Sequence, residues 1–312
     1  MSYELATSTH WRYDFTEQTP FLDNVERIIN AGFTNLDFNF LDMINENCMF
    51  RKEGYLDWIY ECKEFVESKG AKWVQAHAVA PETIGFNDIC IDHIHRSIKA
   101  CSILGIPWIV MHHNFSPKQW GSSLSPMEFN LKFFSQFLDT AEKYGVGIAI
   151  ENNTSWPFFE NDKNGDATNH LIELVDKLGG DHIGICWDVG HSNVASVMEG
   201  AEHIAHQSEQ LKIIGNRLKA THIHDNNTKK YAARFKIKEI GWQAFDEHIE
   251  PYLGDVDWDD VIKGLDSIKY SHYFTYETHK SVNAPYPNEI ADEQMKLLYN
   301  LGKHIISKST LK

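Results

Sequence analysis

Short apolar runs alternate with longer amphipathic stretches along the whole chain. The short runs hold four to eight residues and are rich in Val, Ile, Phe, Trp and Thr, a composition typical of buried strands. Eight runs predict strands: Leu5–Ser8, Phe33–Phe40, Lys72–His77, Trp108–His112, Val146–Glu151, Ile183–Asp188, Leu218–His224 and Tyr273–Glu277.

The stretches between these runs have helical period. Gly32, Gly70 and Gly145 directly follow three of them, and a glycine just past the last helical residue is a common helix end. The predicted helices are Phe21–Ala31, Leu56–Lys69, Ile89–Leu104, Pro126–Tyr144, Thr168–Leu178, Ala201–Ile214, Trp258–Asp266 and Asn288–Ile306. Strands that alternate with helices predict a parallel sheet.

We expect this α/β chain to form a single (β/α)8 TIM barrel domain over residues 1–312, with its active site at the C-terminal ends of the strands. The alternative is a doubly wound open sheet, which usually carries a GxGxxG turn that this sequence lacks. A long loop at about 226–257 follows the seventh strand. Long loops on the active face of a barrel commonly contact substrate.

Charge and cysteine content narrow the class of protein. There are 29 Lys and Arg against 44 Asp and Glu, a net charge of −15, which disfavours a protein that mainly holds phosphate backbones. Five scattered cysteines without a CxxC pair suit a reducing compartment. Neither a secretory signal nor an apolar run of about 20 residues is visible. We expect a cytoplasmic protein that binds neither nucleic acid nor membrane and that can form a homo-oligomer.

Polar residues gather where the predicted strands end, and in a barrel these ends meet at one mouth. Imidazole nitrogen and carboxylate oxygen together suit Mn²⁺, Co²⁺, Zn²⁺ or Mg²⁺. Because strand side chains alternate, only one of His112 and His113 can point inward. We interpret Cys186 as a core residue. The strand-end residues are His77, His112, His113, Glu151, Asp188, His191, His222, His224, Asp225, Glu277 and His279.

The order Glu…Asp-x-x-His…His-x-x-Asp…Glu over the last four strands resembles the xylose-isomerase-like barrel superfamily. That group includes sugar isomerases and epimerases and the endonuclease-four type of apurinic-site nuclease. The resemblance implies one divalent metal, with Mn²⁺ favoured, at Glu151, Asp188, His222 and Glu277. His191 matches a substrate-binding histidine of the epimerases and a zinc ligand of the nuclease.

The same resemblance leaves the number of metals open. His77 and His112 match further zinc ligands of the nuclease, and Asp246 and His248 match the Asp-x-His that completes its three-metal set. Sugar isomerases of the superfamily often keep this Asp-x-His, so its presence does not decide between them. His77 and His112 can equally line the mouth and bind substrate.

We therefore predict a metal-dependent isomerase or epimerase of a sugar, sugar phosphate or cyclitol that works through an enediolate. Glu151 and Glu277 would move the protons and His191 would hold a hydroxyl. Three further residues are predicted to contact the substrate, the first two as an apolar wall and the third as an anion contact: Trp11, Trp156 and Arg234.

Two other classes of function stay open. One is an apurinic-site endonuclease with a trinuclear zinc cluster, which the charge of −15 disfavours. The other covers allied chemistries and binding roles: a keto-inositol dehydratase, a 3-keto-sugar C-deglycosylase subunit, or a non-catalytic sugar-binding subunit.

Overall fold

Eight parallel strands form one sheet in the order β7-β6-β5-β4-β3-β2-β1-β8. The computed structural model describes residues 3–9, 21–41, 43–44, 47–81, 85–113, 118, 121–153, 167–196, 206–235, 244–278 and 287–311. The strands are β1 (Glu4–Ser8), β2 (Asn35–Asn39), β3 (Lys72–His77), β4 (Trp108–His112), β5 (Gly147–Glu151), β6 (Ile183–Asp188), β7 (Leu218–His222) and β8 (Tyr273–Tyr276).

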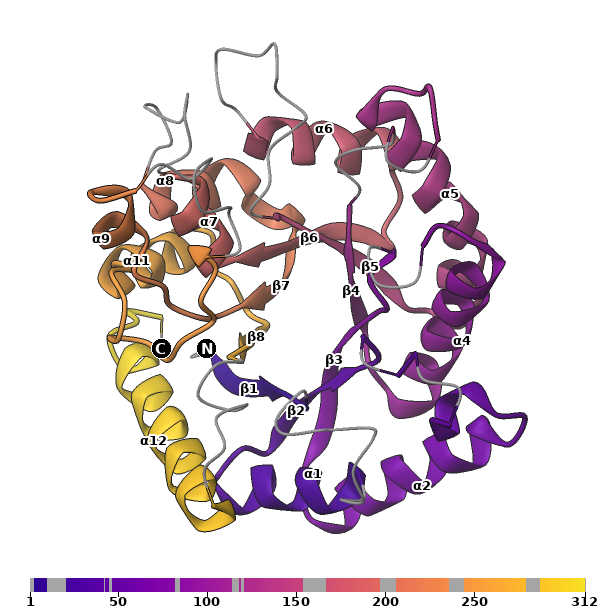
Figure 1. Ribbon diagram of the computed structural model, residues 1–312, viewed down its shortest axis with the longest axis horizontal. Helices are drawn as coiled ribbons and strands as arrows, with labels where there is room; N and C mark the ends of the chain where they lie inside the picture. Colours follow the sequence, from indigo (N-terminus) through magenta and orange to yellow (C-terminus); the bar gives the residue numbers. More distant parts are fainter. Residues whose placement is uncertain are drawn as a thin grey trace.

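The sheet closes into a barrel just beyond β7. Ile223 forms a parallel bridge with Tyr276, its N–H donates to Thr275 O at 2.8 Å, and its carbonyl accepts from Glu277 N at 3.1 Å. Figure 1 shows the strands as an inner ring and the helices around it. The predicted (β/α)8 barrel is confirmed, and the doubly wound alternative is wrong.

Helices follow the strands in the predicted alternation. The helix predicted over Pro126–Tyr144 has those bounds, because Ser125 and Glu128 form a capping box at its start and Gly145 is left-handed at its end. The long helices are α1 (Phe21–Asn30), α2 (Tyr55–Ser68), α4 (Asp88–Leu104), α5 (Pro126–Tyr144), α6 (Ala167–Leu178), α8 (Gln207–Ile214), α11 (Trp258–Ser267) and α12 (Asn288–Ile306).

Two short helices were not predicted. They are α7 (Val189–Ala195), directly after β6, and α9 (Thr228–Ala232), inside the predicted long loop. The helix predicted over Ala201–Ile214 begins at Gln207 within the described residues, since 201–205 lie outside them.

The core has an outer and an inner part. The outer part lies between strands and helices and contains most of the buried aromatic side chains. The inner part fills the barrel with Val110, Ala149, Cys186 and Ala220, which agrees with Cys186 as a core residue. Burial raises the pKa of the Cys186 thiol to about 12. Of the helices in the described ranges, none combines the length and apolarity of a bilayer span.

Candidate metal centre

Four side chains from the ends of β5, β6, β7 and β8 converge at the barrel mouth, and we call Glu151, Asp188, His222 and Glu277 the strand-end cluster. His222 Nδ1 lies 3.3 Å from Glu151 Oε2 and 3.2 Å from Glu277 Oε2. Asp188 Oδ2 lies 4.0 Å from the same nitrogen. One potential ligand atom from each residue lies within 4.8 Å of the others.

The polar atoms of this cluster fit a bound cation. Glu151, Asp188 and His222 are at most 2% exposed. Both Glu151 oxygens, Asp188 Oδ2 and His222 Nδ1 nevertheless make no hydrogen bond within the described part of the chain. Buried polar atoms normally have a partner. Ligands about 2.0–2.2 Å from one ion lie about 3–3.5 Å from each other, so a divalent metal would satisfy these atoms.

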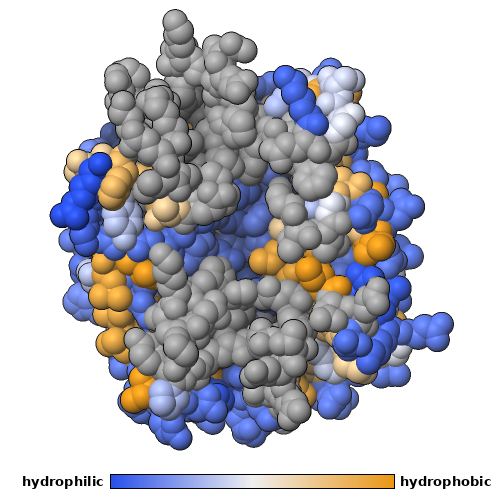
Figure 2. Space-filling view, viewed as in Figure 1, coloured by the Kyte–Doolittle hydropathy of each residue, from blue (hydrophilic) through white to orange (hydrophobic). Residues whose placement is uncertain are grey.

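His77 and His112, the mouth pair, adjoin Glu151 on the side of β3 and β4. Their Nε2 atoms lie 3.1 Å apart, and each lies 3.4 Å from Glu151 Oε2. The His112 side chain is 20% exposed whereas that of His77 is 2% exposed, so His112 faces the opening. Figure 2 shows a hydrophilic hollow at the centre of this view of the barrel.

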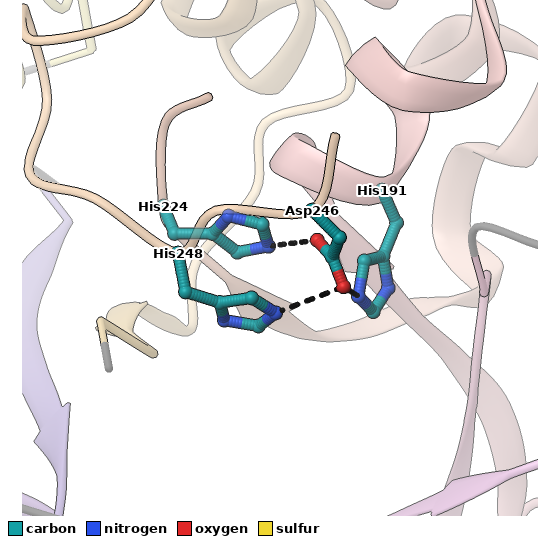
Figure 3. Close-up of side chains that lie close together, drawn as sticks. All are labelled: His191, His224, Asp246 and His248. Atoms are coloured by element: carbon teal, nitrogen blue, oxygen red, sulfur yellow. Dashed lines mark hydrogen bonds and ion pairs between the residues drawn. The ribbon is translucent and has the colours of Figure 1, made fainter. Parts of the chain in front are cut away.

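A second group of four ligands lies beside the strand-end cluster, and we call His191, His224, Asp246 and His248 the loop cluster. His191 Nε2 is 3.6 Å and His248 Nε2 is 3.3 Å from Asp246 Oδ2. His224 Nε2 is 3.9 Å from Asp246 Oδ1. Figure 3 shows the three imidazoles arranged around the Asp246 carboxylate.

Backbone carbonyls orient three of these histidines. His77 Nδ1 donates to Ala78 O at 2.7 Å, His191 Nδ1 to Asn152 O at 2.9 Å, and His248 Nδ1 to Glu277 O at 2.9 Å. Since a carbonyl only accepts, Nδ1 carries a proton, and in the neutral ring Nε2 then keeps the lone pair that a metal binds. This is the usual support for a metal-binding histidine.

Burial and neighbouring charges act in opposite directions on the pKa values of the groups at the mouth. Burial alone would raise the pKa of Glu151, but the imidazoles, His222 first, prevail and hold that pKa well below its usual range. Burial likewise opposes ionisation of Asp246, and His248 and His191 hold its pKa well below the usual value. Asp246 outweighs burial at His248 and raises that pKa to about 9. Positive charge therefore stabilises these carboxylates, and a metal ion would supply it.

His113, the neighbour of His112, points away from the clusters. Its Nδ1 donates to Glu151 O at 2.8 Å, and burial lowers its pKa to about 3. The alternation of side chains along β4 therefore selects His112 to face Glu151. Cys186 Sγ can reach Glu151 and His222, but its raised pKa keeps it a thiol.

Sequence reasoning missed the residues that support the clusters. It listed His224 among the strand-end residues without giving it a role. Asn152 fixes the end of β6, because its side chain accepts from Asp188 N at 2.6 Å and donates to Asp188 O at 2.9 Å. Deeper in the barrel, Gln75 donates to Asp37 at 2.9 Å, and burial raises the pKa of Asp37 to about 6.

Asp225 holds the segment that carries Asp246 and His248. Its carboxylate accepts from Asn226 N at 2.8 Å, Tyr252 N at 3.0 Å, Val256 N at 3.0 Å and Trp258 Nε1 at 3.2 Å. The His-x-x-Asp spacing contained this residue, but only the structure shows that it acts as a scaffold.

Of the three other predicted substrate contacts, only Arg234 lies within the described residues. Trp11 and Trp156 lie outside the described residues. Arg234 follows α9 and is exposed, and within the described ranges no hydrogen bond or ion pair joins its side chain to either cluster. The neighbouring Lys229 instead donates to Asp255 O at 3.3 Å.

Comparison with known proteins agrees with this barrel. An uncharacterized protein of Methanocaldococcus jannaschii, MJ1311, is 26% identical over 211 residues, which are 67% of this chain and 64% of that protein. A D-tagatose 3-epimerase-like protein has a similar crystal structure, with a TM-score of 0.63, 18% identity, and coverage of 96% and 98% of the two chains.

The crystal structure of the IolI protein with a bound zinc atom superposes with a TM-score of 0.68, 16% identity, and coverage of 99% and 100%. At these identities the structural likeness establishes the fold. The family model described as xylose isomerase-like TIM barrel matches residues 25–301. The chain belongs to the xylose isomerase-like TIM barrel family.

Proposed function

We propose that this chain is a divalent-metal-dependent isomerase or epimerase of a sugar, sugar phosphate or cyclitol. The observation that carries the proposal is the position of His222 Nδ1 between two carboxylates, 3.3 Å from Glu151 and 3.2 Å from Glu277. One glutamate comes from β5 and the other from the end of β8. The chain's similarity to an epimerase-like protein supports the same chemistry.

The strand-end cluster would hold the cation. Three carboxylates and one imidazole form an oxygen-rich set that suits Mn²⁺, and the same set accepts Co²⁺, Zn²⁺ or Mg²⁺. When bound, such an ion supplies Lewis acidity, which lowers the pKa of a C–H beside a carbonyl and stabilises the enediolate.

The chain's own residues would move the proton. One of Glu151 and Glu277 removes it from the carbon next to the carbonyl, and the other returns a proton, on the opposite face in an epimerase. His77 and His112 border the opening, and we assign them to substrate oxygens. The pair of glutamates distinguishes this proposal from a non-catalytic sugar binder, which has no need of two bases.

Hydrogen exchange tests the proposal directly. Each ketose of a panel is incubated in D₂O with enzyme and Mn²⁺, and ¹H NMR follows loss of one C–H signal together with appearance of the epimer or aldose. Loss of water without return of a proton would instead indicate a dehydratase.

Substitutions identify the bases. Glu151→Gln and Glu277→Gln should each lower turnover at least about a hundredfold. Glu142→Gln, on the exposed face of α5, is the matched control and should keep full turnover. Full exchange in either site variant would sink the two-base mechanism.

A second candidate is cleavage of apurinic sites by three metal ions. This candidate is favoured because the mouth pair and the loop cluster both adjoin Glu151 of the strand-end cluster. His77 and His112 lie 3.4 Å from Glu151 Oε2, and His191 Nδ1 lies 3.1 Å from Glu151 Oε1. The charge of −15 weighs against binding DNA. Nicking of a duplex with one abasic site, compared with an intact duplex, would support this candidate.

A further inference from the structure

Asp188 uses its two carboxylate oxygens differently. Its Oδ1 accepts from His191 N at 2.6 Å and lies 3.0 Å from His224 Nε2. Its Oδ2 is buried, makes no hydrogen bond within the described part of the chain, and lies 4.0 Å from His222 Nδ1. One oxygen is therefore held on the side of the loop cluster, and the other faces the strand-end cluster, where it can bind a cation.

The ring of His224 is fixed by its surroundings. The side chain is fully buried, and the ring stacks on His248, with centroids 3.7 Å apart and planes inclined by 10°. Gly190 of α7 lies against another part of the ring, since a Cβ at position 190 would be 2.0 Å from His224 Cε1 and 2.2 Å from Nδ1. A ring enclosed in this way has little room to turn, so Nε2 stays beside Asp188.

The contact between His224 and Asp188 is electrostatic. Burial opposes ionisation of Asp188, but His191 and His224 prevail and hold the pKa of that carboxyl below its usual value. Because a carboxylate only accepts, the His224 nitrogen beside it carries the proton. Stacking also keeps the in-plane lone pairs of His224 and His248 apart, so the two rings cannot bind one ion together.

We propose that His224 is a positioning residue for Asp188: by holding Oδ1, it presents Oδ2 to the cation of the strand-end cluster. Residues that support a metal ligand from behind commonly change metal affinity about tenfold to a hundredfold. The family resemblance gives His224 no role. The inference rests on the cation site of the proposed function, but not on which reaction takes place there.

The rival explanation is that His191 N alone fixes Asp188, which is also the N-cap of α7, and that His224 only fills space. Three variants separate the two explanations. His224→Leu keeps an apolar side chain in the space but removes the donor, whereas His224→Gln keeps an N–H for Oδ1. Gly190→Ala retains the imidazole and displaces it. Gly54→Ala is the matched control, because nothing lies within 4 Å of a Cβ at that position.

The affinity of the metal-free protein for Mn²⁺ is measured from the EPR signal of free Mn²⁺. We expect Kd to rise about tenfold to a hundredfold in His224→Leu and in Gly190→Ala, and to stay close to that of wild type in His224→Gln and Gly54→Ala. Glu277→Gln removes a proposed ligand of the same cation and sets the scale of complete loss.

Two results would overturn the positioning role. One is a wild-type Kd in His224→Leu, and the other is an equal loss of affinity in His224→Leu and His224→Gln, which would mean that only the shape of the ring matters. Circular dichroism of each metal-free variant checks the fold. If His224→Leu does not fold, a wild-type Kd in Gly190→Ala contradicts the proposal in its place.

Metal affinity and turnover can fail separately. If His224→Leu loses affinity for Mn²⁺ and wild type turns over no sugar, the positioning role stands and the proposed function fails. If wild type epimerises a ketose and His224→Leu binds Mn²⁺ as tightly as wild type, the proposed function stands and the positioning role fails.

Discussion

The two clusters at the barrel mouth use the same kinds of residue in inverse proportion. The strand-end cluster has three carboxylates and one imidazole, whereas the loop cluster has one carboxylate and three imidazoles. The first is built from the ends of strands, which the closed barrel holds rigid. The second is built from a short helix and from segments outside the strands.

This difference in composition predicts two metal preferences. Carboxylate-rich sets suit Mn²⁺ or Mg²⁺, whereas imidazole-rich sets suit Zn²⁺. The comparison also identifies Asp188 as the residue between them. Its Oδ1 lies 3.0 Å from His224 Nε2, and its Oδ2 faces His222.

The largest effect is expected from Asp188→Asn. Asp188 Oδ1 accepts from His191 N at 2.6 Å, so the amide oxygen would keep that bond and the amide nitrogen would face the strand-end cluster. We expect turnover to fall at least about a hundredfold, while elemental analysis should find the cation of the loop cluster retained. The control is Asp176→Asn, half-exposed and paired with Arg217. Equal damage to both clusters would mean that they act as one site.

Asp225→Ala should damage the loop cluster alone. It removes a carboxylate that accepts four hydrogen bonds, and we expect urea unfolding to show a loss of about 3 kcal/mol or more. One cation per chain should be lost with it. Asp257→Ala, which removes only the cap of α11, should cost about 1 kcal/mol and keep both cations. Retention of both cations in Asp225→Ala would contradict the scaffold role.

Metal-free protein should respond differently to zinc and to manganese. Zn²⁺ should raise the melting temperature by about 5 °C more than Mn²⁺ when its concentration is a hundredfold above Kd, because we expect the imidazole-rich loop cluster to prefer zinc. Differential scanning calorimetry measures this difference, and His248→Ala should abolish it. An equal response of wild type to both ions would remove the distinction between the clusters.

The smallest expected effect is a pH dependence of stability that comes from His93, a buried histidine outside the metal clusters. Burial lowers the pKa of His93 to about 4, and its Nε2 donates to Met43 O at 3.0 Å. Below pH 6.5, the ordinary pKa of histidine, His93 takes up a proton in the unfolded chain but stays neutral in the folded chain. Stability should therefore fall by about 2 kcal/mol between pH 7 and pH 5. In metal-free protein, urea titrations of His93→Gln at each pH should lack this part of the pH dependence. An unfolding free energy that changes with pH as in wild type would refute the prediction.

Much of the fold could be predicted because its signals are local. Lys72–His77, Trp108–His112 and Ile183–Asp188 were predicted as strands with their observed bounds, since each is a compact apolar run. The helix after Ser125 carries its own start and stop residues. The short α7 and α9 have too few residues to show a period, so pattern analysis passed over them.

Some residues of the site could likewise be predicted from the sequence, and others could not. Residues at strand ends could be placed together from the barrel alone, because parallel strands deliver their last side chains to one face. The neighbours of His224 could not all be predicted, since Asp246, 3.9 Å from it, lies on a segment whose path the sequence does not reveal. Asp225 was likewise indistinguishable from an ordinary polar residue after a strand.

Closure of the barrel has a consequence for the order of folding. β1 pairs with β8, so Glu4–Thr7 align with Tyr273–Tyr276 across nearly the whole chain. Contacts so distant in sequence form slowly. During synthesis the first strand waits with an open edge until the last strand emerges, and Glu277 follows that strand directly. The strand-end cluster is thus completed late, and a nascent chain that binds metal earlier would do so with an incomplete set of ligands.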